Sequence, residues 1–433
     1  MSNAKPSYRN PWVWVPSLYL AEGLPYVVVM TVSVIMYKRL GISNTDIALY
    51  TSWLYLPWVI KPLWSPFVDM FRTKRLWIIS MQFLVGVSLA GVALTIPTSH
   101  FFQYTLAVFW LMAFSSATHD ISADGFYMLG LPEHEQAAFV GVRSTFYRIA
   151  MIMAQGGFVV IAGSLEQSTG GNIKLAWLIT LFVLAALMLV LFIYHRFFLP
   201  YPVSDGPAKR EATQTVLGEF FSIFAKFFKR KNIGAILAFL LLYRFAEAQL
   251  VKLVTPFLLD PISKGGLGLT TSEVGVVYGT VGIVALTLGG LLGGYVISRQ
   301  GLKFWLWPMV LIIHLPDLVF VYLSQVQPHN FLIINIGVAL EQFGYGFGFT
   351  AYMMYMILVS EGQHKTAHYA ICTGIMALGM MLPGMFSGWL EDLIGYQHFF
   401  LWVILATVPG FLVALLVKVD PEFGRKKAEA AGQ

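Results

Sequence analysis

The sequence predicts an all-α membrane protein with twelve transmembrane helices in two pseudo-symmetric six-helix halves. Three observations support this fold class. Of the 433 residues, 57% are hydrophobic and 12% are charged, whereas a soluble protein carries about 25% charged residues. Long apolar runs recur along the chain, each with the length of a helix that crosses a bilayer. The polar positions of the first half also reappear, in the same order, in the second half.

The apolar runs define the spans in chain order. We expect them at 12–36, 45–67, 76–96, 101–128, 139–163, 175–197, 233–259, 271–297, 303–324, 331–357, 366–390 and 398–418. The first run is too long for the core of a signal peptide and lacks a small-residue cleavage site, so we interpret it as a helix. In the tenth span, Gly344, Gly346 and Gly348 alternate, which indicates close helix packing. The single cysteine, Cys372, excludes a disulfide framework.

A polar interruption divides the chain into its two halves. Residues 198–232 separate an N-terminal half, 1–197, from a C-terminal half, 233–418, which is followed by a tail at 419–433. Within 213–231, apolar residues recur at helical spacing and end at three basic residues. This pattern is typical of an amphipathic helix on a membrane surface. The interruption is therefore predicted to be a cytoplasmic linker that contains one surface helix.

The basic residues indicate how the spans are oriented. With both termini in the cytoplasm, the cytoplasmic segments hold 19 Lys and Arg residues, whereas the outer loops hold four. This asymmetry follows the positive-inside rule and requires an even number of spans. The formal net charge of +6 is thus explained by membrane topology, and we predict no nucleic-acid partner.

Matching segments carry the internal repeat. Tyr-Leu-Ala-Glu at 19–22 matches Tyr-Arg-Phe-Ala-Glu at 243–247, and the polar helix start at 40–46 matches the one at 267–273. A basic hinge also follows the second span of each half. Two parallel six-helix repeats with such hinges are the organisation of the major facilitator superfamily, whose solute sites lie near the bilayer midplane.

Charged side chains lie inside several predicted spans, where each ion costs roughly 2.5 to 3.5 kcal/mol. The acids within spans are Glu22, Asp120, Asp124, Glu247, Asp317 and Glu341, and the bases are Lys61, Arg143, Arg148, Arg244 and Lys252. In the facilitator fold, spans 1, 4, 7 and 10 line the central cavity, and each of them carries at least one of these acids. Intramembrane charges of this kind mark paths for substrates or protons.

Helical spacing and depth predict how these charges pair. Spans 4 and 5 are joined by a short loop, so we expect Asp124 to pair with Arg143 and Asp120 with Arg148. The acids outnumber the bases by one, and burial of a carboxyl group without a cation favours its protonated form. Glu22 has no basic neighbour on its own helix, and we therefore expect it to carry the coupling proton.

These arguments assign expected roles to particular residues. The expected substrate-binding residues are Tyr26, Asp120, Arg148, Arg244, Glu341 and Tyr345. The expected proton-coupling residues are Glu22, Asp120, Asp124 and Glu247. The expected residues of a cytoplasmic gate are Asp69, Arg72, Arg75 and Arg143. We expect a monomer that contacts lipids and is coupled to protons, with no metal or other cofactor.

Short motifs in both halves are similar to those of the AmpG-type muropeptide permeases. Lys-Pro-Leu-Trp-Ser-Pro-Phe-Val-Asp at 61–69 resembles their K-F-L-W-S-P-x-x-D hinge. Ser-Ser-Ala-Thr-His-Asp-Ile-Ser-Ala-Asp at 115–124 resembles their S-A-S-Q-D-I-x-x-D-A. Weaker matches occur at 147–151, 243–247 and 273–277, so the resemblance runs in order through both halves.

The resemblance implies a proton-driven importer of N-acetylglucosaminyl-anhydro-N-acetylmuramic acid, with or without its peptide, in the bacterial inner membrane. The family's functional residues would correspond to Asp120, Asp124, Arg148, Arg244 and Glu247. The chain departs from the family pattern at Glu22, His119 and 125–127, close to the expected cavity. Another glycan disaccharide, or a solute of the acetyl-CoA or siderophore type, is therefore an alternative substrate.

Other functions are also compatible with part of the pattern. An exporter of drugs or metabolites with the same fold would run as a proton antiporter. A non-transporting receptor or assembly factor would need a binding surface that loops of this length do not offer. The sequence contains no phosphate-binding loop, no metal-ligand spacing and no catalytic nucleophile motif. We therefore predict that the chain is not an enzyme.

Overall fold

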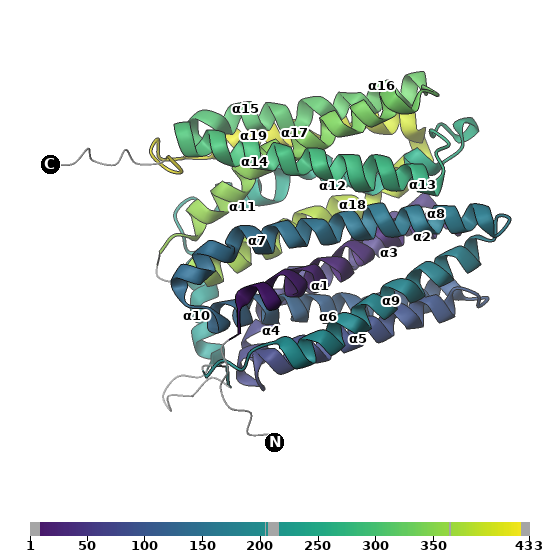
Figure 1. The fold of residues 1–433 in the computed structure, drawn as a ribbon. Coiled ribbons are helices and arrows are strands. Elements are labelled where there is room, and N and C mark those ends of the chain that lie inside the picture. Colours follow the sequence, from purple (N-terminus) through teal and green to yellow (C-terminus); the bar gives the residue numbers. More distant parts are fainter. Residues whose placement is uncertain (1–8, 204, 207–215, 363–364, 426–433) are drawn as a thin grey trace. The chain divides into compact units, whose positions relative to one another are not determined.

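The computed structural model describes residues 9–203, 205–206, 216–362 and 365–425, and every regular element in these ranges is helical (Figure 1). The packing divides the chain into two units. Unit 1 consists of Met1–Ile42, Leu54–Gln214 and Thr270–Gly279, and unit 2 of Ser43–Trp53, Thr215–Leu269 and Thr280–Gln433. Most of unit 1 comes from residues 1–214 and most of unit 2 from residues 215–433, whereas the short exchanged segments 43–53 and 270–279 lie in the opposite units.

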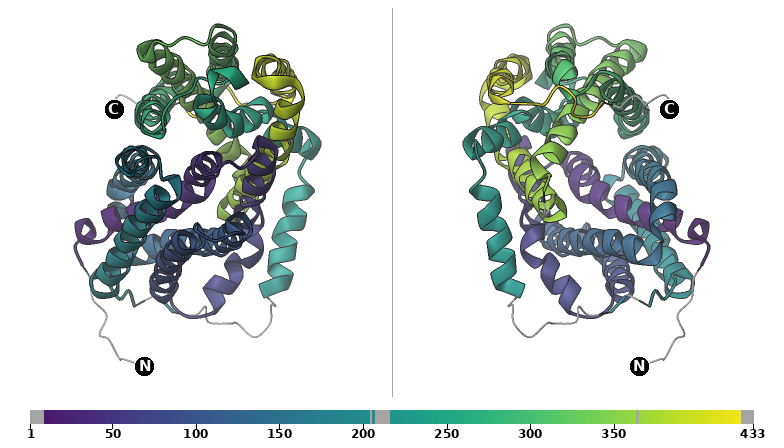
Figure 2. Two further views of the ribbon diagram at one scale, coloured as in Figure 1. Left: turned by 90° about the vertical axis from the view of Figure 1, so that its right-hand side faces the viewer. Right: turned by 90° about the vertical axis from the view of Figure 1, so that its left-hand side faces the viewer.

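Unit 1 is a bundle whose long helices are seen end-on in Figure 2. Its elements are η1 (Pro11–Val13), α1 (Val15–Val27), η2 (Val28–Val32), α2 (Ser33–Arg39), α4 (Leu56–Met70), α5 (Lys74–Thr95), α6 (Phe101–Gly130), α7 (Glu133–Met151), η3 (Ile152–Phe158), α8 (Val159–Ser168), α9 (Ile173–Phe198) and α13 (Thr271–Val274). A core around Trp14, Ile78 and Phe126 joins α1, α5 and α6. Burial of such large apolar side chains fixes the rotation of each helix, and thus the direction of its polar residues.

Unit 2 is a second helical bundle. Its elements are α3 (Asn44–Trp53), α10 (Val216–Phe228), α11 (Ile233–Leu242), α12 (Phe245–Leu259), η4 (Ile262–Lys264), α14 (Ile283–Gln300), α15 (Leu302–His314), η6 (Leu315–Asp317), α16 (Leu318–Val326), α17 (Phe331–Ser360), α18 (Lys365–Leu405) and α19 (Val408–Leu416). The π-helix η5 (Gly275–Gly282) begins in unit 1 and ends in unit 2.

Ten helical stretches within the described ranges are long and apolar enough to cross a membrane. The predicted spans 366–390 and 398–418 fall together in one of them, Ala367–Leu416, where α18 is interrupted by the non-helical Gly395. The predicted span 45–67 corresponds to α3 and α4, which are separated by a short break and are not among the ten. The chain is a multi-pass membrane protein, and the number of twelve transmembrane helices remains a prediction.

Exposed apolar side chains on the long helices agree with a lipid environment. On α9, Val183, Val190, Ile193 and Phe197 are 47% to 62% exposed. They recur at helical spacing, so they form one continuous apolar face. A stripe of this kind is unfavourable in water. We conclude that α9 turns this face to lipid.

A helix, α10, lies within the predicted linker, and one side of it packs into unit 2. Phe227 is completely buried in the core of unit 2, with its ring 5.5 Å from that of His368. Phe221 and Phe228 remain exposed. Val216, Leu217 and Phe220 also belong to the apolar pattern of the predicted linker helix, but their side chains lie outside the described residues. One side of α10 is thus anchored to unit 2, while the two exposed rings are available to a membrane surface.

The exchanged segment of unit 2 is held by polar contacts to α18. Asn44 Nδ2 donates hydrogen bonds to Glu391 Oε2 at 2.6 Å and to the Tyr396 hydroxyl at 2.8 Å. Thr45 Oγ1 donates to Asp392 Oδ2 at 2.5 Å. These contacts involve the polar helix start that the repeat singled out, so its polar residues bind another helix in addition to beginning their own.

The exchanged segment of unit 1 is held by Glu166. This carboxylate is buried and accepts hydrogen bonds from Thr271 Oγ1 at 2.8 Å, Trp177 Nε1 at 3.0 Å and Arg39 Nη2 at 2.9 Å. Thr271 belongs to the second copy of the repeated helix start. The two copies are therefore used alike, because each lies in a short segment that packs on helices from the opposite half of the sequence.

Glycines let α17 approach two neighbouring helices closely. A Cβ atom at Gly346 would lie 2.0 Å from the carbonyl oxygen of Leu286 on α14, and one at Gly344 would lie 2.4 Å from that of Ile312 on α15. At Gly289 of α14, a Cβ atom would lie 2.1 Å from the carbonyl oxygen of Phe343. Small residues at these positions permit backbone contact between membrane helices. The packing role expected for the alternating glycines is confirmed.

The glycine contacts lead to a stability prediction. We expect Gly346→Ala to lower the free energy of unfolding by about 1–3 kcal/mol, because the new methyl group must push α14 and α17 apart. Gly294→Ala is the matched control, since a Cβ atom there meets nothing within 4 Å. Thermal unfolding of the two purified variants checks this result. Equal melting temperatures would contradict the close packing at Gly346.

Candidate functional site

Glu22 lies where α1 meets α7. At the next residue, Gly23, a Cβ atom would lie 2.8 Å from Ala150 Cβ and 3.1 Å from the Tyr147 carbonyl oxygen, so only glycine fits without a shift. Pro25 follows inside α1, and the helix continues as the π-helix η2. π-segments are rare in proteins and are frequent at functional sites. The backbone around Glu22 is thus irregular and tightly packed against α7.

Asp124 and Arg143 form the expected ion pair between α6 and α7. Arg143 Nη2 lies 2.5 Å from Asp124 Oδ1, and the Tyr19 hydroxyl donates to the same oxygen at 3.2 Å. The Arg143 guanidinium also stacks over the rings of Tyr19 at 4.4 Å and Tyr127 at 5.0 Å. Stacking on the two rings stabilises the arginine in addition to the ion pair. The pair is partly exposed, which leaves it accessible to a ligand.

Asp120 has a different partner from the one we expected. Its carboxylate is paired with the ammonium group of Lys61 on α4, whereas the prediction named Arg148. The reason is geometric: α4 packs directly on α6, and a lysine side chain is long enough to reach a neighbouring helix. Both side chains are about one-quarter exposed. Lys61 had been recognised as an intramembrane base, but helix depth alone did not indicate its partner.

Aromatic rings lie beside these charges. Tyr26 of α1 packs edge-on against Trp58 of α4, with ring centroids 5.2 Å apart, and its ring is 6.5 Å from that of Tyr147. Arg148, which follows Tyr147 on α7, is partly buried. Glu22 itself is 7% exposed, and its Oε2 accepts no hydrogen bond from any residue within the described ranges. Unit 1 therefore combines ring faces, paired charges and one carboxyl oxygen without a donor.

The expected gate residues are placed differently from one another. The side chain of Asp69 lies outside the described residues, and Arg72 is exposed with a φ of 71°. Arg75 binds within unit 1: its guanidinium donates to the carbonyl oxygens of Arg196 and Leu199 and stacks over Tyr201 at 3.9 Å. Its backbone N–H donates to Asp205 Oδ2 at 3.0 Å.

A polar chain inside unit 1 was not predicted. Ser17 Oγ lies 2.9 Å from His195 Nε2, His195 Nδ1 lies 2.9 Å from Gln82 Oε1, and Gln82 Nε2 lies 2.9 Å from His119 Nε2. Because the Gln82 amide donates through nitrogen, His119 Nε2 must accept and is unprotonated. His119 thus packs into this chain. The sequence signals for it were the polar Gln82 inside an apolar span and His119 itself.

In unit 2, span 7 is broken next to its charged residues. Arg244 lies between α11 and α12 with a non-helical φ of −109°. Its guanidinium donates to the Tyr345 hydroxyl of α17 and stacks over the rings of Tyr345 at 5.1 Å and Phe349 at 4.7 Å. Two of the predicted substrate-binding residues, Arg244 and Tyr345, are therefore in direct contact.

The remaining acids of unit 2 come together from three elements. Glu247 of α12, Asp317 of η6 and Glu341 of α17 each place one carboxyl oxygen within 4.8 Å of the others. All three are at most 1% exposed. The sequence spacing predicted no such cluster, because these residues lie on helices that are distant in the chain. The one available signal was His314, which shares a helix face with Asp317 three residues later.

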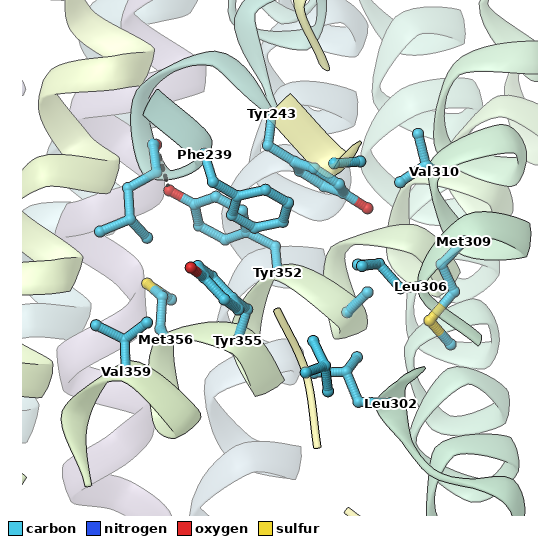
Figure 3. Close-up of a cluster of buried hydrophobic side chains, with 14 of the residues drawn as sticks. Phe239, Tyr243, Leu302, Leu306, Met309, Val310, Tyr352, Tyr355, Met356 and Val359 are labelled. Carbon is cyan, nitrogen blue, oxygen red and sulfur yellow. Dashed lines mark hydrogen bonds between the residues drawn. The ribbon is translucent and has the colours of Figure 1, made fainter. Parts of the chain in front are cut away.

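An aromatic core supports this region of unit 2 (Figure 3). Phe239, Tyr243, Tyr352 and Tyr355 pack against one another, and the Tyr243 and Tyr352 rings are 5.4 Å apart. The Tyr243 hydroxyl donates to the carbonyl oxygen of Gly348 at 3.0 Å, and the Tyr352 hydroxyl donates to that of Leu240 at 2.6 Å. These bonds tie α11 to α17 and so position Arg244 at the end of α11.

Comparison with protein families and sequences points to transporters. The model of the Major Facilitator Superfamily matches residues 17–361. The chain is 26% identical over 420 residues to the anhydromuropeptide permease of Escherichia coli K12, covering 94% of this chain and 80% of that protein. It is 24% identical to the putative transporter AmpG 4 of Rickettsia conorii, covering 92% and 94%. The expected resemblance to AmpG-type permeases is confirmed.

Solved structures show the same fold. The nucleoside transporter NupG matches with a TM-score of 0.71 and 16% identity, covering 95% of this chain and 100% of that chain. The D-xylose-proton symporter matches with a TM-score of 0.70 and 12% identity, covering 95% and 97%. At these identities the similarity concerns the fold alone.

Proposed function

We infer a transport function because this chain belongs to the Major Facilitator Superfamily, whose model covers residues 17–361. It is a multi-pass membrane transporter and not an enzyme. Its sequence is similar to AmpG-type permeases along nearly its whole length. The charged and aromatic residues within each unit then indicate which kind of solute the protein can bind.

We propose that the chain imports an amino-sugar saccharide, GlcNAc-anhydro-MurNAc or an anhydro-muropeptide, across the bacterial inner membrane, with both termini in the cytoplasm. The observation that carries this proposal is the 26% identity over 94% of the chain to a permease named for anhydromuropeptide. The residues of unit 1 support it, since ring faces of Tyr26 and Trp58 lie near carboxylates and a lysine. Such a set can stack on a sugar ring and hydrogen-bond its hydroxyl and amide groups.

The proposed cycle is alternating access around a site near the bilayer midplane. Within unit 1, Asp120 and Lys61 offer a carboxylate and an ammonium group to polar groups of the sugar. Within unit 2, Arg244, which contacts Tyr345, offers a guanidinium group to an anionic group. Arg148 assists from α7. The π-helices and the break at Arg244 support this cycle, because irregular helices allow a membrane segment to rearrange without losing its whole hydrogen-bond ladder.

Proton coupling is the second part of the proposal. Glu22 is buried, and its Oε2 accepts no hydrogen bond from the described residues. A carboxyl group in this position is stable when neutral and unfavourable when ionised. We propose that Glu22 is protonated as solute enters and releases its proton toward the cytoplasm, which makes import follow the proton gradient.

Uptake into proteoliposomes tests the proposed function. With an inside-alkaline gradient, radiolabelled anhydro-muropeptide should accumulate, and plain chitobiose and other disaccharides should not. Arg148→Ala should reduce the initial rate at least tenfold, because it removes a cation from the proposed site. Lys174→Ala, at an exposed residue in the first turn of α9, serves as the control and should keep the wild-type rate.

The alternative outcomes are distinct. Accumulation of another disaccharide would retain the transporter and overturn the substrate. Accumulation without a gradient would overturn proton coupling. If no glycan enters, but expression protects cells from toxic compounds, the chain would be an exporter.

A further inference from the structure

Three buried carboxyl groups in unit 2 have too few partners for three negative charges. Glu247, Asp317 and Glu341 are 0%, 1% and 1% exposed, and one oxygen of each lies within 4.8 Å of the others. Glu341 Oε2 accepts a hydrogen bond from Gln342 Nε2 at 3.0 Å. In the described part of the chain, no donor bonds to either oxygen of Glu247 or of Asp317. Four buried carboxyl oxygens therefore lack a hydrogen bond.

A histidine is aimed at the same cluster. His314 is 3% exposed and lies three residues before Asp317, with Nδ1 3.9 Å from Asp317 Oδ2. The Nδ1 atom of His314 forms no hydrogen bond with any residue that the structure describes. Its Nε2 lies on the side of α19 and of the Tyr243 backbone, and a Cβ atom at Gly410 would lie 2.8 Å from it. A buried ring nitrogen that points toward the acids without a hydrogen bond is a second, independent sign of a binding site here.

The neighbouring elements bring few charges to this cluster. The groups that act on it electrostatically are Arg244 and His314, beside the three acids themselves. Arg244 donates to the Tyr345 hydroxyl and stacks on two rings, and the Tyr243 ring is 6.2 Å from His314. The helix α19 carries no titratable residue. One arginine therefore faces three acids.

This imbalance defines what the cluster must bind. Like charges that share a buried site cannot all be ionised, so some of the carboxyl groups must be neutralised. A metal ion would need the three carboxyl groups to be ionised and water to fill its remaining ligand positions, but these residues are at most 1% exposed. A proton needs only one oxygen and can be shared between two. The cluster fits protons better than a metal ion.

We propose that Glu247, Asp317 and Glu341, with the His314 ring beside them, form a proton-storage site in unit 2. The proton binds to a carboxylate oxygen and can move between the three carboxyl groups. It is released to water when the site opens. The inference rests on the proposed proton-coupled transport. It joins Glu247, which the sequence placed among the proton-coupling residues, to Asp317, Glu341 and His314, and it gives a functional role to Asp317 and His314 of span 9.

Charge displacement on a solid-supported membrane tests this proposal. Proteoliposomes with the full chain receive a pH step in the absence of solute, so that the current reports proton binding alone. Wild-type protein should give a current that Asp317→Asn and Glu341→Gln each reduce at least twofold. Asp420→Asn, an exposed acid beyond α19, is the control. Thermal unfolding of each variant identifies loss of the fold.

Three outcomes would overturn the proposal. If Asp317→Asn folds and retains the full current and proton stoichiometry, the storage site is refuted, although gradient-driven uptake still supports the proposed function. If Glu22→Gln alone removes the whole current, the storage site is refuted without any variant in unit 2. If the current follows sodium steps and not pH steps, both the storage site and proton coupling fail.

Discussion

Replacing Lys61 by methionine is expected to reduce solute uptake about 30- to 100-fold. Lys61 pairs with Asp120, and the pair is only about one-quarter exposed. Removing one partner of an ion pair that is partly exposed lowers the free energy of unfolding by about 2–3 kcal/mol. Lys61 is also a proposed solute contact, and a hydrogen bond from a charged group contributes about 2–3 kcal/mol. Since every 1.4 kcal/mol is a factor of ten, loss of that contact corresponds to the expected reduction in uptake. The initial rate of uptake into proteoliposomes measures it.

A double variant separates binding from folding. Lys61→Met combined with Asp120→Asn leaves no unpaired charge, so it should recover most of the melting temperature lost in Lys61→Met. If the pair binds solute, as proposed, uptake stays low in the double variant. If uptake recovers with stability, the pair only joins α4 to α6. Lys264→Met, on an exposed loop residue, should leave both quantities unchanged.

Replacing Glu22 by glutamine is expected to abolish accumulation while retaining exchange. Glutamine keeps the shape of the side chain but cannot release a proton. Each pH unit of gradient is worth 1.36 kcal/mol per proton, or a tenfold concentration ratio. With a gradient of about one pH unit, the accumulation ratio should therefore fall by about tenfold for each proton that Glu22 carries. Counterflow of labelled solute, which needs no net proton movement, should continue.

The readouts for Glu22 exclude simpler explanations. Loss of both accumulation and counterflow would mean that Glu22 serves binding or packing, and not coupling. Wild-type accumulation in Glu22→Gln would assign the coupling proton to other residues, with the cluster of Glu247, Asp317 and Glu341 as the next to test. Glu361→Gln, an exposed acid after α17, is the matched control and should behave as wild type.

Local patterns were sufficient for features that depend on one helix or on adjacent helices. Long apolar runs identify membrane spans because the bilayer core has a fixed thickness. The Asp124–Arg143 pair was predictable because a short loop makes α6 and α7 neighbours, and their spacing places both groups at one depth. The alternating glycines of α17 predicted packing because backbone contact requires small side chains.

Contacts between helices that are distant in the chain were not predictable in this way. Lys61 reaches Asp120 because α4 packs on α6, and that contact depends on how each helix is rotated. The same holds for the polar chain through Gln82 and for the meeting of Glu247, Asp317 and Glu341. Counting the charged residues within the predicted spans gave one more acid than bases. In the structure, however, three of these acids in unit 2 lie near one arginine.

The amino-acid sequence by itself determined that this chain is a helical membrane protein with an internal repeat and charges within its spans. Hydropathy and periodicity are local properties, so they can be determined without knowledge of the fold. The tertiary structure alone decided which charges meet, which helix starts are exchanged between the units, and which carboxyl groups lack partners. Those outcomes depend on helix rotation and depth, which are set by the packing of many side chains at once.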